Sequence, residues 1–462
     1  PSGLCRQRDD TDCIERGCRS MLRIKTSGLN KFHLNWLVIF QYAFILCVIL
    51  NFRSIWLHTD SLASVGRIIK LLMGLSVVGG VIARKKFSSH RMLVCFAVMA
   101  CLIVYWGIWY LADSLKSGSM ITILVQFLAI VVYCLLVEDS VDDTMRKFTN
   151  IVLVIAAVSL FFWVFGSLLG RIPSTGSLYT TWTDDGSLKK VRSYYGIYFE
   201  TQSGTFFGLT VNRILRNTAI FTEAPMASFV FFLAFLYELL MREKLDWKRC
   251  VILAAAVIST ISTTGVSTLI IAIGLRYVFT RSKTKGGLSL KLFILPMAFV
   301  VALVALSFLL EQKLGTSSGS VRVDDFAAGY KAWMDAPLFG NGYGNTASYK
   351  QYMSSFRSHN QGFSNSLMQV LAYGGIYLFL PYCIAAFRGL FRLARGRQWI
   401  RMAFYVVFIY AFVITICPFQ MLTFYLFISM ARERKAKGVK KAVDEPQIAS
   451  VPVQRRVRIK VQ

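Results

Sequence analysis

Two stretches of the sequence place charged side chains directly beside apolar runs. The first, VNRILRNTAIFTEAPMASFVFF, contains Arg213, Arg216 and Glu223 just before a strongly apolar segment. Arginine offers paired donors to phosphate or carboxylate oxygens, and a carboxylate can accept a proton from a hydroxyl group. An ionised acid near the middle of a membrane costs about 2.5–3.5 kcal/mol, so Glu223 should face a polar cavity or an arginine. The alternative is that Glu223 begins a helix, where the helix dipole and Pro225 favour it.

The second stretch is SGSVRVDDFAAGYKAWMDAPLFGNGYGN, which contains Arg322. Residues 323–333 have the spacing of a short amphipathic helix with aromatic residues on one side, which would lie on the membrane surface. Pro337 and the glycines between 340 and 344 then predict a tight turn. Such a turn either reverses the chain or lets the backbone approach a ligand closely.

The composition indicates what surrounds these residues. Hydrophobic residues make up 55% of the 462 residues and charged residues only 16%, which is typical of a chain whose solvent is lipid. The Lys and Arg residues behind the formal net charge of +28 lie in the breaks between apolar runs. The sequence therefore predicts an integral membrane protein and no binding of nucleic acid.

Apolar runs near the roughly 20 residues needed to cross a bilayer recur along the chain. Lipid offers the backbone no hydrogen-bond partner, so every span should be helical. We predict an all-α polytopic membrane protein with about 12 transmembrane helices and two long outer loops. The predicted spans are 34–50, 65–82, 91–111, 119–137, 149–170, 219–241, 250–263, 266–280, 290–310, 364–387, 399–416 and 417–431.

The basic residues orient these spans, because Lys and Arg accumulate in short cytoplasmic loops. Basic clusters follow alternate spans, which predicts that both chain ends are cytoplasmic. The segment 250–280 fits this alternation as a hairpin of two short helices or as a re-entrant hairpin. One long tilted helix would place every later basic cluster outside.

This orientation divides the chain into three parts. Residues 1–33 form a basic cytoplasmic N-terminal segment, residues 34–431 form the membrane domain, and residues 432–462 form a basic cytoplasmic tail. Two long segments, about 171–218 and 311–363, are predicted to lie outside. Long loops on a rigid scaffold are where functional residues usually lie.

The beginning of the chain has its own prediction. The chain begins with Pro1, and the polar composition of residues 1–20 predicts that the natural chain starts at Met21. The apolar run 34–50 follows basic residues without a small-residue cleavage site after it. We therefore expect a first span and not a removed signal peptide.

The motifs resemble those of the O-antigen polymerase and ligase superfamily of bacterial envelope glycosyltransferases, over most of the chain. One element is Arg-x6-Glu-x-Pro, made of Arg216, Glu223 and Pro225, at the entrance to a span. Another is Arg322 at the opening of the last large outer loop. The remaining elements are the AW..APLFGNGYGN stretch and SNSLMQVLAYGGIYLFL, in which an Asn-containing start leads into an apolar helix.

The resemblance implies a GT-C-like enzyme that needs no metal, cofactor or nucleotide sugar. Its donor and acceptor would be undecaprenyl-diphosphate-linked oligosaccharides on the outer face of the bacterial cytoplasmic membrane. The expected reaction joins these repeat units into a surface polysaccharide, such as an O-antigen, a capsule or an exopolysaccharide. Chain-length regulator and flippase proteins are the expected protein partners.

The resemblance also implies roles for individual residues. Arg216 and Arg322 would bind the diphosphate leaving group, and Glu223 or His359 would accept the proton of the acceptor hydroxyl. Many members carry a His-Asn pair in the register that Ser364-Asn365 occupies here, whereas His359-Asn360 lies five residues upstream. The expected substrate-binding residues are Arg213, Tyr343, Asn360 and Asn365. Aromatic candidates for stacking on sugar rings are Trp182, Tyr194, Tyr195, Tyr198 and Phe199.

Two other functions fit the same layout. A ligase that transfers finished glycan to a lipid or a protein shares the motifs. A flippase for lipid-linked oligosaccharides also has about twelve spans, but it should show repeat symmetry, broken helices and binding groups spread through the spans. The sequence has no zinc-ligand spacing, so no metal site is expected.

Overall fold

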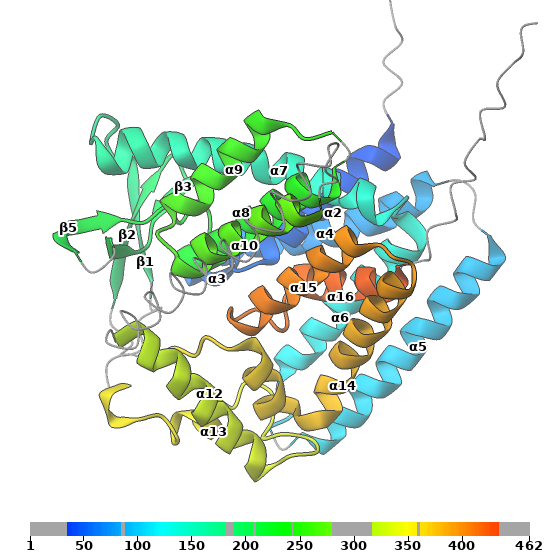
Figure 1. Cartoon of the computed structure of the whole chain (residues 1–462). Helices are drawn as coiled ribbons and strands as arrows, with labels where there is room; N and C mark the ends of the chain where they lie inside the picture. The colour runs from blue at the N-terminus through cyan, green and yellow to red at the C-terminus, as the bar shows by residue number, and fades with distance from the viewer. Residues whose placement is uncertain are drawn as a thin grey trace, which may run out of the picture.

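The computed structural model describes residues 35–84, 88–113, 115–180, 188–206, 209–242, 244–279, 317–357 and 361–433. Most of this part of the chain is helical, and a small group of β-strands lies at one side of the helices (Figure 1). The fold is thus mostly helical, as the sequence predicts.

Helices occupy eleven of the twelve ranges that the sequence predicts as spans, and the twelfth, 290–310, lies outside the described residues. A break at residues 260–262 separates two helices within 250–280, which excludes one continuous helix there. Short π-helical segments η2 (Tyr133–Val137), η3 (Trp163–Leu168) and η4 (Tyr237–Met241) continue three of the helices. The eleven helices are α2 (Trp36–Asn51), α4 (Ala63–Ala83), α5 (Ser89–Ala112), α6 (Gly118–Val132), α7 (Val141–Phe162), α8 (Ala224–Leu236), α9 (Trp247–Ser259), α10 (Thr263–Phe279), α14 (Ser366–Arg395), α15 (Trp399–Val413) and α16 (Met421–Arg432).

Helix length and hydropathy define a multi-pass membrane protein. Among the described residues, α2, α10, α15 and α16 are shorter apolar helices. Six helical stretches are long and apolar enough to cross a bilayer: Asp60–Ala83, Ser89–Ala112, Gly118–Val137, Val141–Leu168, Ala224–Met241 and Ser366–Arg395.

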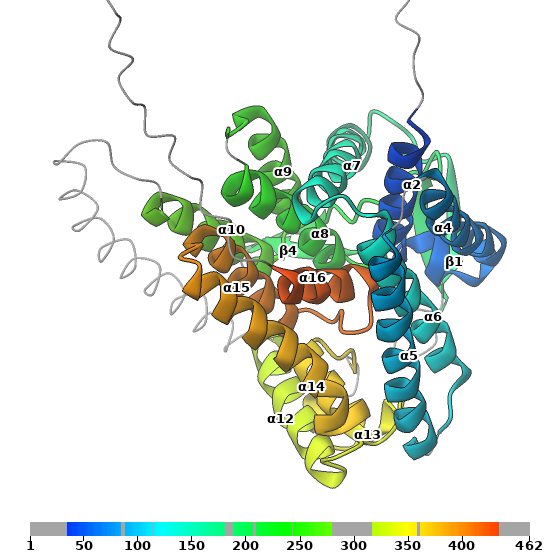
Figure 2. The same ribbon diagram turned by 90° about the vertical axis from the view of Figure 1, so that its right-hand side faces the viewer.

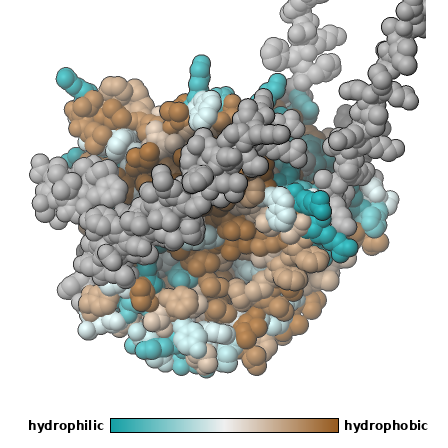
Figure 3. All heavy atoms as spheres, viewed as in Figure 1, coloured by the Kyte–Doolittle hydropathy of each residue, from teal (hydrophilic) through white to brown (hydrophobic). Residues whose placement is uncertain are grey.

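The helices differ in how much of their surface is covered. Every residue of α8 except Pro225 is buried, and its neighbours include α7, α9 and α10 (Figure 2). By contrast, α5 lies at the edge of the bundle and exposes large apolar side chains, among them Leu93, Phe96 and Leu111. Apolar residues also cover much of the face shown in Figure 3. An uncovered apolar surface of this extent is what lipid contact requires.

The segment predicted as the first outer loop contains strands, so the prediction of an all-α fold is wrong there. Strands β1 (Gly176–Thr180), β2 (Lys189–Tyr194) and β3 (Tyr198–Glu200) form an antiparallel sheet. Strands β4 (Ser203–Phe206) and β5 (Leu209–Leu215) form a separate hairpin. Lipid restricts the backbone to helices only inside the bilayer, so a segment outside it is free to form sheets.

Three of the aromatic residues predicted to stack on sugars are buried instead. Tyr194 and Tyr198 pack with Phe162, and Phe199 packs edge-on against Trp56. Of the other two candidates, Tyr195 is exposed and Trp182 lies outside the described residues. The buried rings attach the sheet to the helices, so the stacking prediction is wrong for them.

Helix α12 (Ser317–Asp335) contains the predicted amphipathic segment, and α13 (Ala347–Lys350) follows it. The residues that α12 exposes include Val323, Phe326 and Tyr330, while Ala328 and Ala332 on the other side are buried. Phe326 and Tyr330 therefore lie on the uncovered face, as the spacing predicts, whereas Trp333 is half-buried and packs against the core.

The glycine-rich turn after α12 packs directly onto α14. Asn341 N–H donates to the Ala372 carbonyl at 2.8 Å, and Gly342 N–H donates to the Tyr373 carbonyl at 3.1 Å. Gly375 has φ +60° and interrupts the helical backbone of α14. The turn thus supplies hydrogen-bond partners to a helix that is broken at this point.

The approach of the turn to α14 is too close for a side chain. A Cβ atom on Gly340 would lie 2.3 Å from the Gly374 backbone nitrogen, and one on Gly375 would lie 2.4 Å from the Leu338 carbonyl oxygen. The sequence left two roles open for these glycines: reversing the chain, or letting the backbone approach a ligand closely. The structure uses the glycines to dock one part of the chain onto another.

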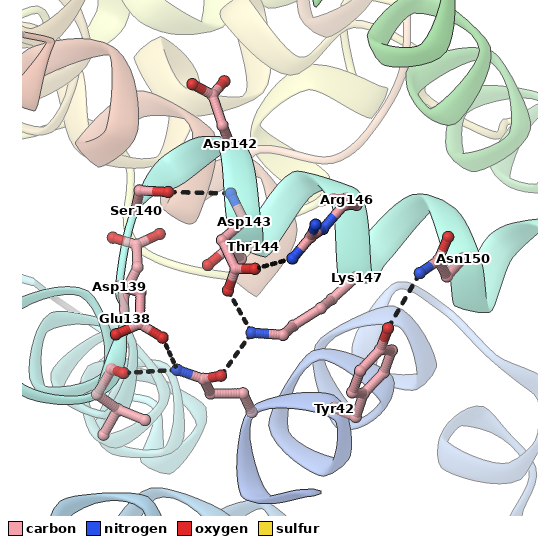
Figure 4. A network of polar contacts seen from close by, with 12 residues as sticks. Tyr42, Glu138, Asp139, Ser140, Asp142, Asp143, Thr144, Arg146, Lys147 and Asn150 are labelled. Atoms are coloured by element: carbon pink, nitrogen blue, oxygen red, sulfur yellow. Dashed lines mark hydrogen bonds and ion pairs between the residues drawn. The ribbon is translucent and has the colours of Figure 1, made fainter. Parts of the chain in front are cut away.

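A network of polar contacts joins α2, α7 and the end of η2 (Figure 4). Lys147 is buried, donates to the Gln41 side chain and forms an ion pair with Asp143. Gln41 in turn donates to the Asp139 carboxylate at 2.9 Å. A buried ammonium group is tolerated only with such partners.

We expect Gly340→Ala to destabilise the protein more than Gly344→Ala. Both glycines have positive φ, +74° and +83°, where alanine costs roughly 1–2 kcal/mol. Only the Cβ at position 340 meets backbone atoms, because nothing lies within 4 Å of the one at position 344. Thermal unfolding of the detergent-purified variants measures the difference, and equal melting temperatures would contradict the close contact.

Candidate functional site

A cavity of about 510 Å³ lies between the start of α8, the start of α12 and the segment before α14. Its volume is within the range of roughly 300–1,000 Å³ that is usual for sites of small molecules. The charged residues that line it are Arg53, Glu223, Arg322 and Lys350, and its polar residues include Thr346, Gln361, Ser364, Gln369 and Thr415. Two of the predicted catalytic residues, Glu223 and Arg322, therefore meet in one cavity.

Arg322 is held there by neutral partners. Its guanidinium donates to the Thr264 hydroxyl at 2.9 Å and to the Ile414 carbonyl at 3.3 Å. Burial lowers the pKa of Arg322 below its ordinary value, but the group stays protonated at neutral pH. Within the described part of the chain it forms no ion pair with a carboxylate. A half-buried cation with neutral partners favours an anionic ligand.

Glu223 sits at the N-cap position of α8, but its side chain does not cap the helix. The Gln202 side-chain oxygen accepts from Ala224 N–H at 3.0 Å instead. The Glu223 carboxylate lies 3.7 Å from the guanidinium of Arg53. Both sequence interpretations of Glu223 thus hold in part: it begins a helix, and it faces an arginine across a cavity.

Arg53 was not among the predicted site residues. It follows α2 with a left-handed backbone, φ +56°, and its carbonyl accepts from Thr222 N–H at 3.0 Å. Ile55 N–H donates to the Ile220 carbonyl at 2.9 Å, so the segment after α2 pairs with the segment before α8. This pairing places Arg53 beside Glu223. The sequence did contain a signal for Arg53: it follows the first predicted span on the side predicted to be outside, where basic residues are rare.

Arg216 lies close to this cavity but does not line it. Its side chain donates to the Thr260 carbonyl at 2.8 Å, at the break between α9 and α10. Burial lowers its pKa to about 10, and the negative charge of Glu223 opposes this shift. The neighbouring Asn217 is buried and donates to the hydroxyls of Ser159 and Ser259. Arg216 is therefore part of a packed junction behind the cavity.

A buried ion pair supports the cavity wall formed by α12 and the segment before α14. Arg357 is 1% exposed and donates to Asp325 at 2.8 Å and to Asp324 at 3.3 Å. The other oxygen of Asp325 accepts from the Ser364 backbone N–H at 2.9 Å, and Ser364 lines the cavity. The acidic pair that follows Arg322 in sequence thus holds the loop segment before α14.

The remaining predicted residues have different positions. Asn365 caps α14, with its side-chain oxygen accepting from Met368 N–H at 3.0 Å. Arg213 lies on β5. His359 and Asn360 lie outside the described residues. Tyr343 lines a second, smaller cavity.

This smaller cavity has a volume of about 240 Å³ and adjoins the larger one. The two share Arg53, Gln369, Tyr373 and Ile416 as lining residues. Its other lining residues are His58, Tyr343, Gly344, Pro418, Phe419 and Gln420.

His58 in this cavity was also missed by sequence reasoning. It is the last residue of the short helix α3 (Ile55–His58), and its Nδ1 lies 3.1 Å from the Ser54 carbonyl oxygen. Burial lowers the pKa of His58, and the charges of Arg53 and Lys70 act in the same direction. The ring is therefore neutral at neutral pH. Since it stands alone in sequence, no motif pointed to it.

The charges of the larger cavity suit an anion better than a metal ion. Three of its four charged lining residues are cations. Within the described residues, no group of three or more His, Cys, Asp or Glu side chains is placed to hold a metal ion.

Comparison with known proteins identifies no relative: no protein-family model matches the chain, and no curated protein matches it significantly. The functional assignment therefore depends on the geometry of the two cavities.

We expect Glu223→Gln to strengthen binding of inorganic pyrophosphate by roughly 3- to 10-fold, because the change removes a negative charge from a cationic cavity. Arg322→Gln should weaken it by a similar factor. Isothermal titration of the protein in lipid nanodiscs measures both effects. Asp335→Asn is the control, since it removes the same charge from the exposed end of α12. Unchanged or weaker binding by Glu223→Gln would contradict an anion site.

Proposed function

We propose that this protein is a membrane glycosyltransferase that polymerises polyprenyl-diphosphate-linked oligosaccharide repeat units into a surface polysaccharide. The observation that carries the proposal is the cavity that Arg53, Arg322, Lys350 and Glu223 line together, with Arg53 3.7 Å from Glu223. A diphosphate leaving group needs several cations, and a hydroxyl nucleophile needs a nearby proton acceptor. Arg53, Arg322 and Lys350 are the candidate cations, and Glu223 is the candidate proton acceptor.

The proposed reaction is a single displacement. The hydroxyl oxygen of one repeat unit attacks the anomeric carbon of another, whose bond to the diphosphate breaks with its electron pair. Arg322 and Arg53 stabilise the negative charge on the departing diphosphate. The hydroxyl proton passes to Glu223, whose negative charge Arg53 balances before the diphosphate arrives.

We further propose a twelve-span, GT-C-like layout in the bacterial cytoplasmic membrane, with both chain ends in the cytoplasm. Helix α2, helix α8 with η4, and helix α16 each have a cavity-lining residue beside one end: Arg53, Glu223 and Gln420. Toward the other end each has a residue with a hydrogen-bonded or ion-pair partner: Gln41 with Asp139, Glu238 with Arg249, and Arg432 with Glu138. Polar groups at both ends of these apolar helices support opposite sides for the two groups. The basic clusters then fall on the cytoplasmic side.

A ligase remains the alternative within the same chemistry, because it also displaces a polyprenyl diphosphate. A flippase is the alternative from another class, and the break in α14 at Gly375 is the observation that favours it. However, that break is filled by the backbone of the 337–342 turn and not by a binding site. The charged groups of the cavity belong to the ends of helices and to loops, which suits chemistry at a membrane surface.

Reporter fusions test the layout. We expect alkaline phosphatase fused after Tyr195 to be active, because the first outer loop would be outside, and a fluorescent protein fused there to be dark. Fusions after Arg397, in the turn between α14 and α15, should behave in the opposite way. Cytoplasmic reporters at residues 171–218 or 311–363 would rule out both the layout and the outer-face reaction.

Glycan length tests the reaction. Cells that lack the protein should accumulate single repeat units, and the wild-type chain should restore a ladder on a gel. We expect Arg322→Lys to reduce ladder formation at least about tenfold, because lysine keeps the charge but loses the planar pair of donors. The control is Arg388→Lys at matched expression. Arg388 is exposed and lies near the C-terminal end of α14, whereas the cavity is at the N-terminal end. Arg216→Ala should also fail to restore the ladder.

Other outcomes of the same gel identify the alternatives. A ladder that forms without the protein but stays unattached to its acceptor would indicate a ligase. Lipid-linked units trapped on the inner leaflet would indicate a flippase. Full activity of Arg322→Lys would exclude diphosphate binding through its paired donors.

A further inference from the structure

The smaller cavity has an aromatic wall. The rings of Tyr373 and Phe419 lie nearly parallel, with 6.2 Å between their centroids and 9° between their planes. Tyr343 meets Phe419 edge-on at 5.2 Å. Tyr373 is 4% and Phe419 9% exposed, so only a small part of each ring meets the cavity, whereas Tyr343 is half-buried. Together the three rings give the cavity an apolar wall without charge.

Neutral polar groups complete the lining. The Gln420 side chain does not cap α16 although the residue occupies its N-cap position, and it has no hydrogen-bond partner among the described residues. The Gln369 amide donates to the Tyr373 hydroxyl at a long distance of 3.4 Å. Two amide side chains therefore have hydrogen-bonding capacity to offer a ligand.

The two adjoining cavities differ in charge. Four charged side chains line the larger one, whereas Arg53 is the one Arg, Lys, Asp or Glu among the described residues that line the smaller one. A sugar ring has apolar C–H faces and hydroxyl groups around its edge. An aromatic wall with nearby amides matches this pattern, as apolar pockets with a few placed polar groups generally do for their ligands.

We propose that the smaller cavity is a saccharide subsite, in which a sugar ring packs against Tyr343 and against the parts of Phe419 and Tyr373 that line the cavity, and its hydroxyls bind Gln420 and Gln369. Because the two cavities share a wall at Arg53, a ring here lies next to an anion in the larger cavity. This inference rests on the proposed function for the identity of that anion as a diphosphate. The proposed subsite takes its sugar contacts from Tyr343, from Gln369 and Tyr373 on α14, and from Phe419 and Gln420 just before α16.

Two binding measurements on the full chain in lipid nanodiscs test the subsite. The probes are inorganic pyrophosphate and the oligosaccharide that mild acid releases from lipid-linked repeat units of cells lacking the protein. We expect Gln420→Ala to weaken oligosaccharide binding at least about fivefold and to leave pyrophosphate binding within about twofold of wild type. Lys350→Ala, which changes only the larger cavity, should show the reverse pattern.

Phe419→Leu is the second variant, because it keeps an apolar side chain but removes the flat ring. We expect the same selective loss of oligosaccharide binding, with thermal unfolding recorded for each variant.

The outcomes separate the two proposals. If the wild-type protein binds pyrophosphate but not the oligosaccharide, or if neither variant weakens oligosaccharide binding, the saccharide subsite is wrong and the proposed function stands. If the wild-type protein binds neither probe, the proposed function is wrong and the subsite with it.

Discussion

The contact between the 337–342 turn and the break in α14 holds the described part of the segment 317–363 in place. Backbone groups make this contact, and it depends on glycines at 340 and 375 because a side chain at either position would meet backbone atoms. The residues that the loop brings to the two cavities include Arg322, Lys350 and Tyr343. This docking and the buried pairs of Arg357 with Asp324 and Asp325 together offset the conformational entropy that a long segment loses when it is ordered.

The helices were predictable from sequence because lipid imposes one simple requirement on the backbone. Runs such as 65–82 and 119–137 fall on α4 and α6 within a few residues. The strands of the first outer loop were not predictable in the same way, since that requirement ends at the membrane surface. Their aromatic residues, such as Tyr198, looked available for a ligand because sequence does not show which side of a strand is buried.

The candidate site was only partly predictable. Glu223 and Arg322 stood out because charge beside an apolar run needs an explanation, and both line the same cavity. Arg53 and His58 reach the site through the pairing of residues 54 and 221, a long-range contact that no local pattern encodes. Asn365 has a polar side chain that could bind a ligand, but in the structure this side chain caps the N-terminus of α14.

The docked turn also changes what its glycine-rich motif means. Gly340 and Gly375 mark where two pieces of backbone meet, Gly342 lies against the Asp113 side chain, and none of the three supplies a reactive group. Proteins that share this motif would therefore share a way of anchoring the segment that follows α12, whatever they transfer or bind. Their chemistry would have to be compared through the side chains that face the cavities.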